Sequence, residues 1–392
     1  MKRIGVFLGA EPHAGGAFQY NQSIVTALAA LPPGEFQCVA AFGAEVWRPL
    51  LAQTPLRPVP LPVNVISRRL VGGVERLHVP PLLWRWGGAW WEPVGRTVLA
   101  QRCDLWIFPS QDAWSYLLPV PALSAVHDLM HRYEPGFSEV GDAREYARRE
   151  LHYRRLCARS RGILVDSHLG GRHVEESYGT PGARIHVLPF VPPADILQQD
   201  AAIPADMPDI PADFLFYPAQ FWSHKNHALL VRALASLQER HPDMHLVFSG
   251  GPKNAYESVR ALCETLKVTQ RVHCVGYVSS AVLAALYRRA RGLVMPSFFG
   301  PTNIPPLEAF ALGCPAAVAD VYAMAEQADG AALLFDPRSV DSAAAAMSAL
   351  WSDANLREDL RQRGMGRSQR WNQDHFNARL ASIIHRTLCS GP

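Results

Sequence analysis

The chain has 392 residues and a mass of 43.3 kDa, a length that predicts two domains. Hydrophobic residues make up 48% of the chain and charged residues 19%, which is typical of folded proteins and excludes wholesale disorder. The 38 Lys and Arg residues nearly balance the 35 Asp and Glu residues, giving a net charge of +3. This balance excludes a protein whose main task is to neutralise nucleic-acid phosphates, so we expect no nucleic-acid partner.

The seven cysteines are scattered along the chain, and no two form a Cys-x-x-Cys pair. This spacing argues against a disulfide framework and a zinc site and favours a reducing compartment. The charged start at Met1-Lys2-Arg3 is followed by an apolar run that meets Glu11, which is too short for a signal peptide. Since no run of 18 apolar residues occurs either, we expect a cytoplasmic protein.

Short apolar runs alternate with helical patterns through the first half of the chain. A buried strand is predicted at 3–8, followed by a glycine-rich turn and a helix at 19–30. Further strands are predicted at 36–41, 104–108, 123–126, 162–165 and 185–188. Continuous apolar runs separated by helices are typical of a parallel sheet with helices on both faces.

A second series of strands follows a segment, 198–213, that is rich in proline and acidic residues and lacks periodicity. The second series is predicted at 214–218, 245–249, 272–276, 292–295, 316–319 and 331–335. We therefore expect a first domain at 1–197, a linker at 198–212, a second domain at 213–368 and a C-terminal helix at 369–392. Two doubly wound α/β domains of this kind bind a ligand at the carboxyl ends of their strands, in a cleft between them.

The most informative motif is the segment Pro296–Ala309, which follows a predicted strand and runs into a helix. A turn rich in glycine and proline that leads into a helix N-terminus favours phosphate binding, because backbone N–H groups and the helix dipole point at one place. Pro305 and Pro306 fit the first helical turn, where no N–H is needed. Glu308, expected in the same turn, either reaches the ribose hydroxyls of a bound nucleotide or merely caps its helix.

Together with His224-Lys225-Asn226-His227, this segment resembles the family 4 glycosyltransferases, retaining enzymes of the GT-B fold that use nucleotide-sugar donors. The resemblance covers essentially the whole chain. Its other parts, in order, are Gly15-Gly16, Val126-His127-Asp128-Leu129, Val165-Asp166-Ser167, Ile185-His186-Val187-Leu188-Pro189, Phe248-Ser249-Gly250-Gly251, Val275-Gly276-Tyr277-Val278 and Leu286-Tyr287. It implies an α/β protein with two Rossmann-like doubly wound domains facing a central cleft. By the same resemblance, 1–197 is the acceptor-side domain, 213–368 is the donor-nucleotide domain, and the helix at 369–392 crosses back to the first domain.

The resemblance also implies a role for each matching residue. Lys225 binds the donor pyrophosphate, and Glu308 accepts the ribose hydroxyls. His127 lies beside the transferring sugar, and no protein nucleophile is expected, so His127 and Lys225 are the candidate catalytic residues. The remaining candidate donor-binding residues are the loop glycines Gly15, Gly16, Gly250, Gly251 and Gly300, the backbone amides of Thr302, Asn303 and Ile304, and Gln220, Tyr277 and Val278 around the phosphates and base.

Each role has a structural alternative. Lys225 is otherwise a solvated lysine at the start of a helix, and the pair Gly15 and Gly16 otherwise provides only loop flexibility. Tyr277 is otherwise a core residue, and His127 a buried structural histidine.

Two positions depart from the family pattern. Gly300 stands where the family has the first Glu of its E-x7-E pair, which leaves the donor sugar open. A branch with a GPTN loop shares this change, and there Asn303 takes over sugar contacts. Gln220 stands where an Arg commonly precedes the phosphate-binding Lys, so one positive charge is missing unless His224 or an Arg of the first domain supplies it. Because no Asp-x-Asp occurs, we expect no metal and no cofactor.

Two segments suggest a contact outside the donor site. Four tryptophans lie between Trp84 and Trp91, behind Arg68, Arg69 and Arg76. The predicted helix at 144–161 carries seven arginines against two glutamates. A peripheral contact with an anionic membrane, or docking of a lipid-linked acceptor, is one interpretation. Aromatic residues packed in the core and a solvated charged helix face are the other.

We expect a retaining, metal-independent transferase that moves a hexose or 6-deoxyhexose from a nucleotide-diphosphate sugar to a glycan or lipid-linked oligosaccharide. GDP-mannose is the first donor to consider, which makes the chain a mannosyltransferase of cell-surface polysaccharide or lipopolysaccharide synthesis, cytoplasmic or peripheral at the inner face of the membrane. The alternatives are a non-catalytic nucleotide-sugar-binding protein and a sugar-nucleotide 2-epimerase on the same fold.

Overall fold

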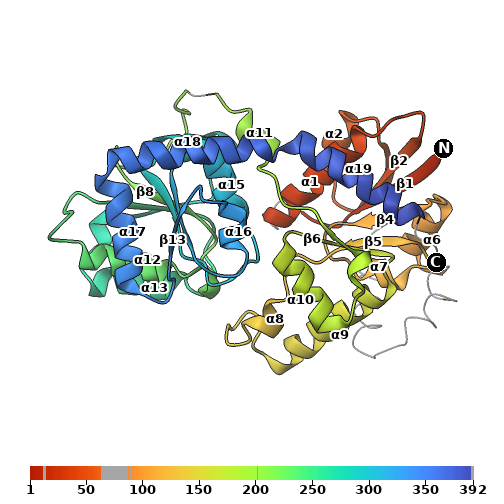
Figure 1. The fold of residues 1–392 in the computed structure, drawn as a ribbon, viewed down its shortest axis with the longest axis horizontal. Coiled ribbons are helices and arrows are strands. Elements are labelled where there is room, and N and C mark those ends of the chain that lie inside the picture. Colours follow the sequence, from red (N-terminus) through yellow and green to blue (C-terminus); the bar gives the residue numbers. More distant parts are fainter. Residues whose placement is uncertain (12–14, 63–86, 88–90, 201, 390–392) are drawn as a thin grey trace. The chain divides into compact units, whose positions relative to one another are not determined.

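The computed structural model describes residues 1–11, 15–62, 87, 91–200 and 202–389. The chain divides into two compact units (Figure 1). The first unit contains Met1–His131, Ala143–Pro189 and Gln373–Pro392, and the second contains Arg132–Asp142 and Phe190–Asn372. Each unit holds one parallel sheet, which confirms the predicted α/β class with two Rossmann-like domains.

The first unit is built on a seven-stranded sheet in the order β3-β2-β1-β4-β5-β6-β7. Its strands are β1 (Lys2–Leu8), β2 (Phe36–Phe42), β3 (Arg57–Pro60), β4 (Leu105–Phe108), β5 (Ala122–Ala125), β6 (Gly162–Val165) and β7 (Ile185–Val187). Its helices include α1 (Gly16–Ala29), α2 (Trp47–Ala52), α6 (Pro93–Ala100), α7 (Trp114–Leu117), α9 (Ala143–Arg159) and α10 (His168–Tyr178), and α8 (Met130–Tyr133) runs across the boundary of the units. The edge strand β3 was not predicted, because the prolines of Arg57-Pro58-Val59-Pro60 suggest a loop; proline is compatible with an edge strand.

The last helix of the chain, α19 (Gln373–Cys389), packs against α1 of the first unit. Its apolar stripe is fully buried and consists of Phe376, Leu380, Ile383 and Ile384. The ring of Phe376 lies edge-on to Tyr20 at 6.0 Å, and Gln373 Nε2 donates to the Ser23 carbonyl at 3.1 Å. The spacing of the stripe therefore fixes which face of α19 is buried.

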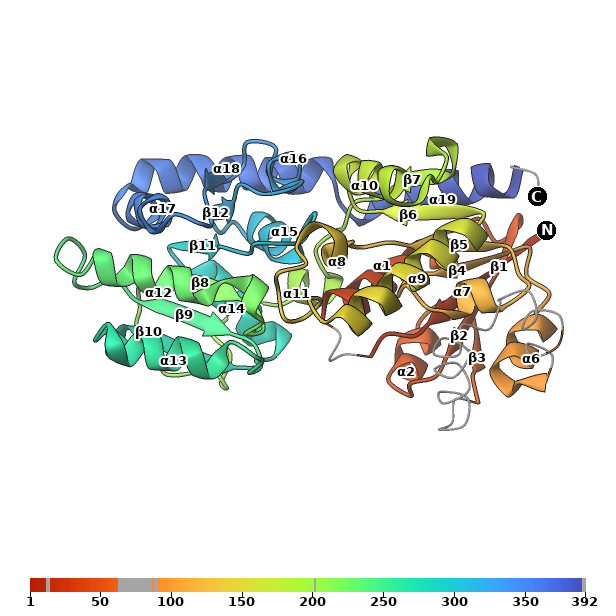
Figure 2. The same ribbon diagram turned by 90° about the horizontal axis from the view of Figure 1, so that it is seen from below.

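The second unit is built on a six-stranded parallel sheet in the order β10-β9-β8-β11-β12-β13. Its strands are β8 (Leu215–Pro218), β9 (Leu246–Ser249), β10 (Val272–Gly276), β11 (Gly292–Met295), β12 (Ala316–Ala319) and β13 (Leu333–Phe335). Its helices are α11 (Ala194–Leu197), α12 (His227–Ser236), α13 (Tyr256–Thr265), α14 (Ser280–Arg289), α15 (Ile304–Ala311), α16 (Met324–Ala328), α17 (Val340–Ser352) and α18 (Ala354–Arg370). In Figures 1 and 2, helices cover both faces of this sheet, as its continuous apolar strands predicted.

Two short segments expected in the first domain belong to the second unit instead. Residues 190–197 join it because Ile196 is part of its core and Phe190 packs against that core. Residues 132–142 join it because Phe137 packs against Phe298 at 5.5 Å and neighbouring polar groups bond to second-unit loops. The described part of the expected linker, 198–212, contains no helix or strand.

The tryptophan-rich segment and its arginines lie almost entirely outside the described residues. Of this set only Trp91 is described, and its side chain is 86% exposed. In α9, Glu145 pairs with Arg148 and Arg149, and Glu150 pairs with Arg154. Within the described part of the chain, no helix is both long and apolar enough to cross a bilayer.

Candidate donor site

The candidate donor residues of the second unit lie in loops that follow its parallel strands. Lys225 follows β8, Gly250 follows β9, Tyr277 follows β10, and Asn303 follows β11. The order in which strands are added switches at the neighbours β8 and β11, since β9 and β10 extend the sheet on one side and β12 and β13 extend it on the other. Ligands of open α/β sheets bind outside the carboxyl ends of the strands at such a switch point. The sequence motifs therefore meet where the fold offers a binding site.

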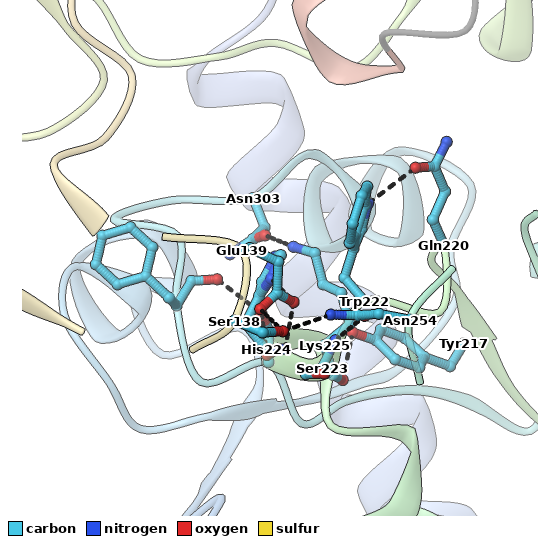
Figure 3. Close-up of polar contacts among 12 residues, drawn as sticks. Ser138, Glu139, Tyr217, Gln220, Trp222, Ser223, His224, Lys225, Asn254 and Asn303 are labelled. Carbon is cyan, nitrogen blue, oxygen red and sulfur yellow. Dashed lines mark hydrogen bonds and ion pairs between the residues drawn. The ribbon is translucent and has the colours of Figure 1, made fainter. Parts of the chain in front are cut away.

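Lys225 is held in a short turn, η4 (Ser223–Lys225), directly before α12. Its ammonium donates to Asn303 Oδ1 at 3.1 Å, and its carbonyl accepts from the Tyr217 hydroxyl at 3.0 Å (Figure 3). Asn226, with a φ of 57°, ends the turn, and its amide donates to the carbonyls of Pro296 and Pro337. The turn is thus fixed to the loop that leads into α15.

Asn303 is the N-cap residue of α15 and is 8% exposed. Its backbone N–H donates to Gln327 Oε1 at 3.0 Å, and its carbonyl accepts from Gln327 Nε2 at 2.7 Å. Pro305 and Pro306 occupy the first helical turn, as expected, and carry no N–H. Of the three amides expected to face a donor, that of Asn303 is therefore occupied here, while the Asn303 side chain faces Lys225.

Gly300 has a φ of +128°, a conformation that L-residues rarely adopt. A Cβ on Gly300 would lie 2.6 Å from Asn303 Nδ2 and 2.9 Å from Asn303 Oδ1. The space beside position 300 is thus filled by the Asn303 amide group. The glycine at 300, which departs from the family pattern, is therefore sterically linked to the asparagine at 303.

Glu308 is the fifth residue of α15, so the expectation that it lies in the first helical turn is wrong. Its carboxylate is 4% exposed and accepts from the Tyr287 hydroxyl at 2.6 Å. Burial, and secondly the neighbouring Glu308, raise the pKa of Tyr287 well above its ordinary value, so the phenol keeps its proton and donates. The carboxylate is oriented by α14, and helix capping does not explain its place.

Of the candidate glycines Gly250 and Gly251, only Gly250 is required by a close approach of the backbone. Gly250 has a φ of +138°, and a Cβ there would lie 2.4 Å from the Ala219 carbonyl oxygen. At Gly251 a Cβ would meet nothing within 4 Å.

The other candidates of the second unit are described by their side-chain contacts and exposure. Gln220 Oε1 accepts from Trp222 Nε1 at 3.0 Å. Tyr277 is 70% exposed, which excludes the alternative that it is a core residue, and Val278 packs against the core.

The remaining candidates belong to the first unit. Gly15 has a φ of +58° at the start of α1, and Gly16 is the first residue of that helix. His127 Nε2 lies 2.7 Å from the Pro109 carbonyl, and the ring lies edge-on to Tyr20 at 4.9 Å. Burial lowers the pKa of His127, so the imidazole is neutral at pH 7 and donates its Nε2 proton to Pro109. Asp128 accepts from the Met130 amide at 3.0 Å and so caps the next turn.

Sequence reasoning missed three polar residues that support the site. Gln327 bonds to both backbone groups of Asn303, Asn254 Oδ1 accepts from the Ser223 amide at 2.9 Å, and Glu139 contacts His224. None of the three lies in a motif, and Glu139 lies 85 positions from its partner. Among the described residues, no group of three or more His, Cys, Asp or Glu is arranged to hold a metal ion.

Comparison with known proteins gives the class of this site. Residues 209–367 match the family model of the glycosyl transferases group 1. The D-inositol 3-phosphate glycosyltransferase of Jonesia denitrificans is 26% identical over 293 residues, which are 70% of this chain and 68% of that protein. The O-antigen chain mannosyltransferase B of Escherichia coli is 31% identical over 104 residues, 26% of this chain and 27% of that protein.

The fold has solved counterparts as well. The structure of Anabaena HepE in complex with UDP-glucose superposes with a TM-score of 0.70 at 14% sequence identity and covers 98% of this chain and 100% of that one. The two parallel sheets and the group 1 match define a glycosyltransferase of the GT-B fold. The region that matches the glycosyl transferases group 1 model, 209–367, lies within the second unit, which also carries Lys225 and Asn303.

Proposed function

We propose that this protein is a retaining, metal-independent hexosyltransferase whose donor diphosphate binds at Lys225 and at the start of α15. The supporting observation is the 3.1 Å contact between Lys225 Nζ and Asn303 Oδ1, which brings a positive charge to a helix N-terminus. An ammonium group has three donors, so Lys225 has the capacity to bind Asn303 and a phosphate oxygen together. Helix dipole and ammonium then stabilise the departing diphosphate, which is the work that a divalent cation does elsewhere.

The buried pair of Glu308 and Tyr287 supports the next part of the proposal, recognition of the donor ribose. A carboxylate has about four acceptor positions, so Glu308 has the capacity to accept from the Tyr287 hydroxyl and from ribose hydroxyls together. Exposed Tyr277 then lies against the base, beside Val278. For the first unit, the family resemblance assigns Gly15 and Gly16 to the donor phosphates and neutral His127 to the transferring sugar.

The next part of the proposal concerns the donor sugar and the spatially adjacent residues Gly300 and Asn303. Asn303 occupies the space beside position 300, so its amide replaces the carboxylate that the family pattern places there. We propose a hexose or 6-deoxyhexose donor, with GDP-mannose first, because the aligned Escherichia coli protein is a mannosyltransferase. The proposed acceptor is a glycan or lipid-linked oligosaccharide of a cell-surface polysaccharide.

Donor turnover in EDTA tests this function without knowledge of the acceptor. The purified chain is incubated with GDP-mannose, UDP-glucose or dTDP-rhamnose, and slow donor hydrolysis is followed by NMR. We expect one donor to be consumed and its sugar to be released first with the donor's anomeric configuration. Binding without turnover would favour a non-catalytic protein. Appearance of a sugar inverted at C2 would favour an epimerase, and complete dependence on added metal would contradict metal independence.

A further inference from the structure

The segment Arg132–Asp142 forms part of the second unit although the residues on both sides of it belong to the first. It packs on the loops that carry the candidate donor residues. Phe137 lies 5.5 Å from the Phe298 ring and 6.3 Å, nearly perpendicular, from the His224 ring. The segment therefore covers both the turn before Lys225 and the loop before Asn303.

Two polar contacts connect this segment to the turn Ser223–Lys225 (Figure 3). Ser138 Oγ accepts from Asn254 Nδ2 at 2.8 Å, and Asn254 Oδ1 accepts from the Ser223 amide at 2.9 Å. Glu139 Oε1 accepts from the His224 amide at 3.3 Å and lies 3.2 Å from His224 Nδ1. Two consecutive backbone amides of the turn, those of Ser223 and His224, are thus bound by side-chain oxygens of Asn254 and Glu139.

The carboxylate of Glu139 is suited to hold this turn. The side chains of His224 and Glu139 are only 16% and 10% exposed, so water screens their contact little. Burial alone would raise the pKa of Glu139, but hydrogen bonds from its own backbone and from His224 outweigh burial and lower it. The group is therefore ionised at neutral pH, and because a carboxylate only accepts, His224 Nδ1 carries the proton.

Because the turn is fixed, the backbone position of Lys225 is restricted as well. The carbonyl of His224 accepts from the Phe298 amide at 2.8 Å, which links the turn to the loop before Gly300. The next residue is Lys225, with its amide bonded to the Trp222 carbonyl at 2.9 Å and its ammonium bonded to Asn303. With both neighbours of the lysine backbone fixed, its side chain starts from one defined position.

We propose that Glu139 is a positioning residue for the donor diphosphate, because it fixes the turn from which Lys225 reaches the phosphates. Glu139 touches neither the donor nor Lys225 and acts through His224. This inference rests on the proposed function, since it assigns Glu139 a part in the same phosphate site. It also assigns a role in the donor site to a segment that lies far from the donor-domain motifs in sequence.

The test compares binding of a nucleoside diphosphate with binding of the matching nucleoside, in EDTA, by calorimetry. The probes are GDP with guanosine, UDP with uridine and dTDP with thymidine. For the pair that binds, we expect Glu139→Ala to weaken the diphosphate at least tenfold and to change nucleoside affinity less than twofold. Equal losses for both probes would overturn the inference, because they would show general damage to the unit.

A second carboxylate of the same segment provides the matched control. Glu134 accepts from the Tyr322 hydroxyl at 2.8 Å and pairs with Arg338 at 3.5 Å, and neither partner lies in the Ser223–Lys225 turn. Glu134→Ala is expected to keep the diphosphate affinity within threefold of the wild type. A loss equal to that of Glu139→Ala would overturn a specific role for Glu139.

Two more variants keep the result interpretable. Glu139→Gln keeps the shape and an acceptor oxygen, so we expect it to fold like the wild type and to bind the diphosphate with an affinity between those of the wild type and Glu139→Ala. Wild-type affinity in Glu139→Gln, when Glu139→Ala does not fold, would overturn the inference.

Lys225→Ala separates the positioning role of Glu139 from the proposed phosphate site. If Lys225→Ala binds the diphosphate weakly while both Glu139 variants bind normally, only the positioning role fails. If Lys225→Ala binds normally, the proposed phosphate site itself fails.

Discussion

At the scale of single residues, Asp112 is a buried carboxyl group that the donor site does not use. It follows β4 and lies against Gly9, where a Cβ would come within 2.3 Å of Asp112 Oδ1. Its Oδ2 is buried and has no hydrogen-bond partner among the described residues. Burial raises the pKa of Asp112 to about 7. An ionised carboxylate with one buried oxygen that has no hydrogen-bond partner destabilises the fold.

The raised pKa predicts how stability depends on pH. The unfolded chain has a pKa of about 3.9 at this residue, so between about pH 4 and pH 7 the folded state binds the extra proton and loses stability as pH rises. Asp112→Asn is expected to raise the thermal midpoint by about 2–4 °C at pH 8, and by less at pH 5. Thermal unfolding of both proteins across this range checks the prediction. The same gain at both pH values would contradict it.

At the scale of elements, the loop between β11 and α15 depends on Gly300. Gly300→Ala would force a Cβ against the Asn303 amide at a φ of +128°. Such strain costs about 1–3 kcal/mol, so we expect Asn303 to move and the bond to Lys225 to break. The expected result is a fall of about tenfold in nucleoside diphosphate affinity, measured by calorimetry.

The control for this variant is Gly34→Ala, because a Cβ at Gly34 meets nothing within 4 Å and its backbone is not in the left-handed region. It is expected to leave affinity and thermal midpoint unchanged. Wild-type affinity in Gly300→Ala would show that the spatial link between positions 300 and 303 does not affect the phosphate site.

The elements themselves were largely predictable because most strands are buried on both faces and form short apolar runs. β10, β11 and β12 begin and end at the predicted residues, and β6 does as well. β3 was missed because two of its four residues are proline, which only an edge position allows. The position of Glu308 was wrong by about one residue because α15 begins at Ile304, directly before the two prolines.

At the scale of the whole molecule, the packing of α19 predicts how the two units differ in stability. Phe376 is fully buried against α1 in the first unit, so Phe376→Ala is expected to cost about 3–5 kcal/mol. We expect faster hydrogen exchange in α1 and unchanged exchange in α15 of the second unit. His375→Ala, at an exposed neighbour, serves as the control and is expected to change stability by less than about 0.5 kcal/mol. Equal acceleration in both helices would contradict the assignment of α19 to the first unit.

The assignment of chain segments to the two units shows which contacts could not be predicted from the sequence. Motifs identified Lys225, Asn303 and Glu308, because each follows a strand that the apolar pattern reveals. The sequence did not reveal that the segment with Glu134 and Glu139 belongs to the second unit, since the contacts that place it there join positions 85 and 188 residues apart. Such long-range polar pairs leave no periodic signal, and only the folded chain brings them together.

The most direct test of the account is the affinity of the wild type and Lys225→Ala for GDP, UDP and dTDP in the presence of EDTA. A charge-assisted contact contributes about 1.5–3 kcal/mol, so we predict that one nucleotide binds and that Lys225→Ala weakens it about 10- to 100-fold. The thermal midpoint is expected to change little, since the hydrogen bond from Lys225 Nζ to Asn303 is only partly buried. Unchanged affinity in Lys225→Ala, or binding of none of the three nucleotides without metal, would contradict a metal-independent diphosphate site at Lys225 and Asn303.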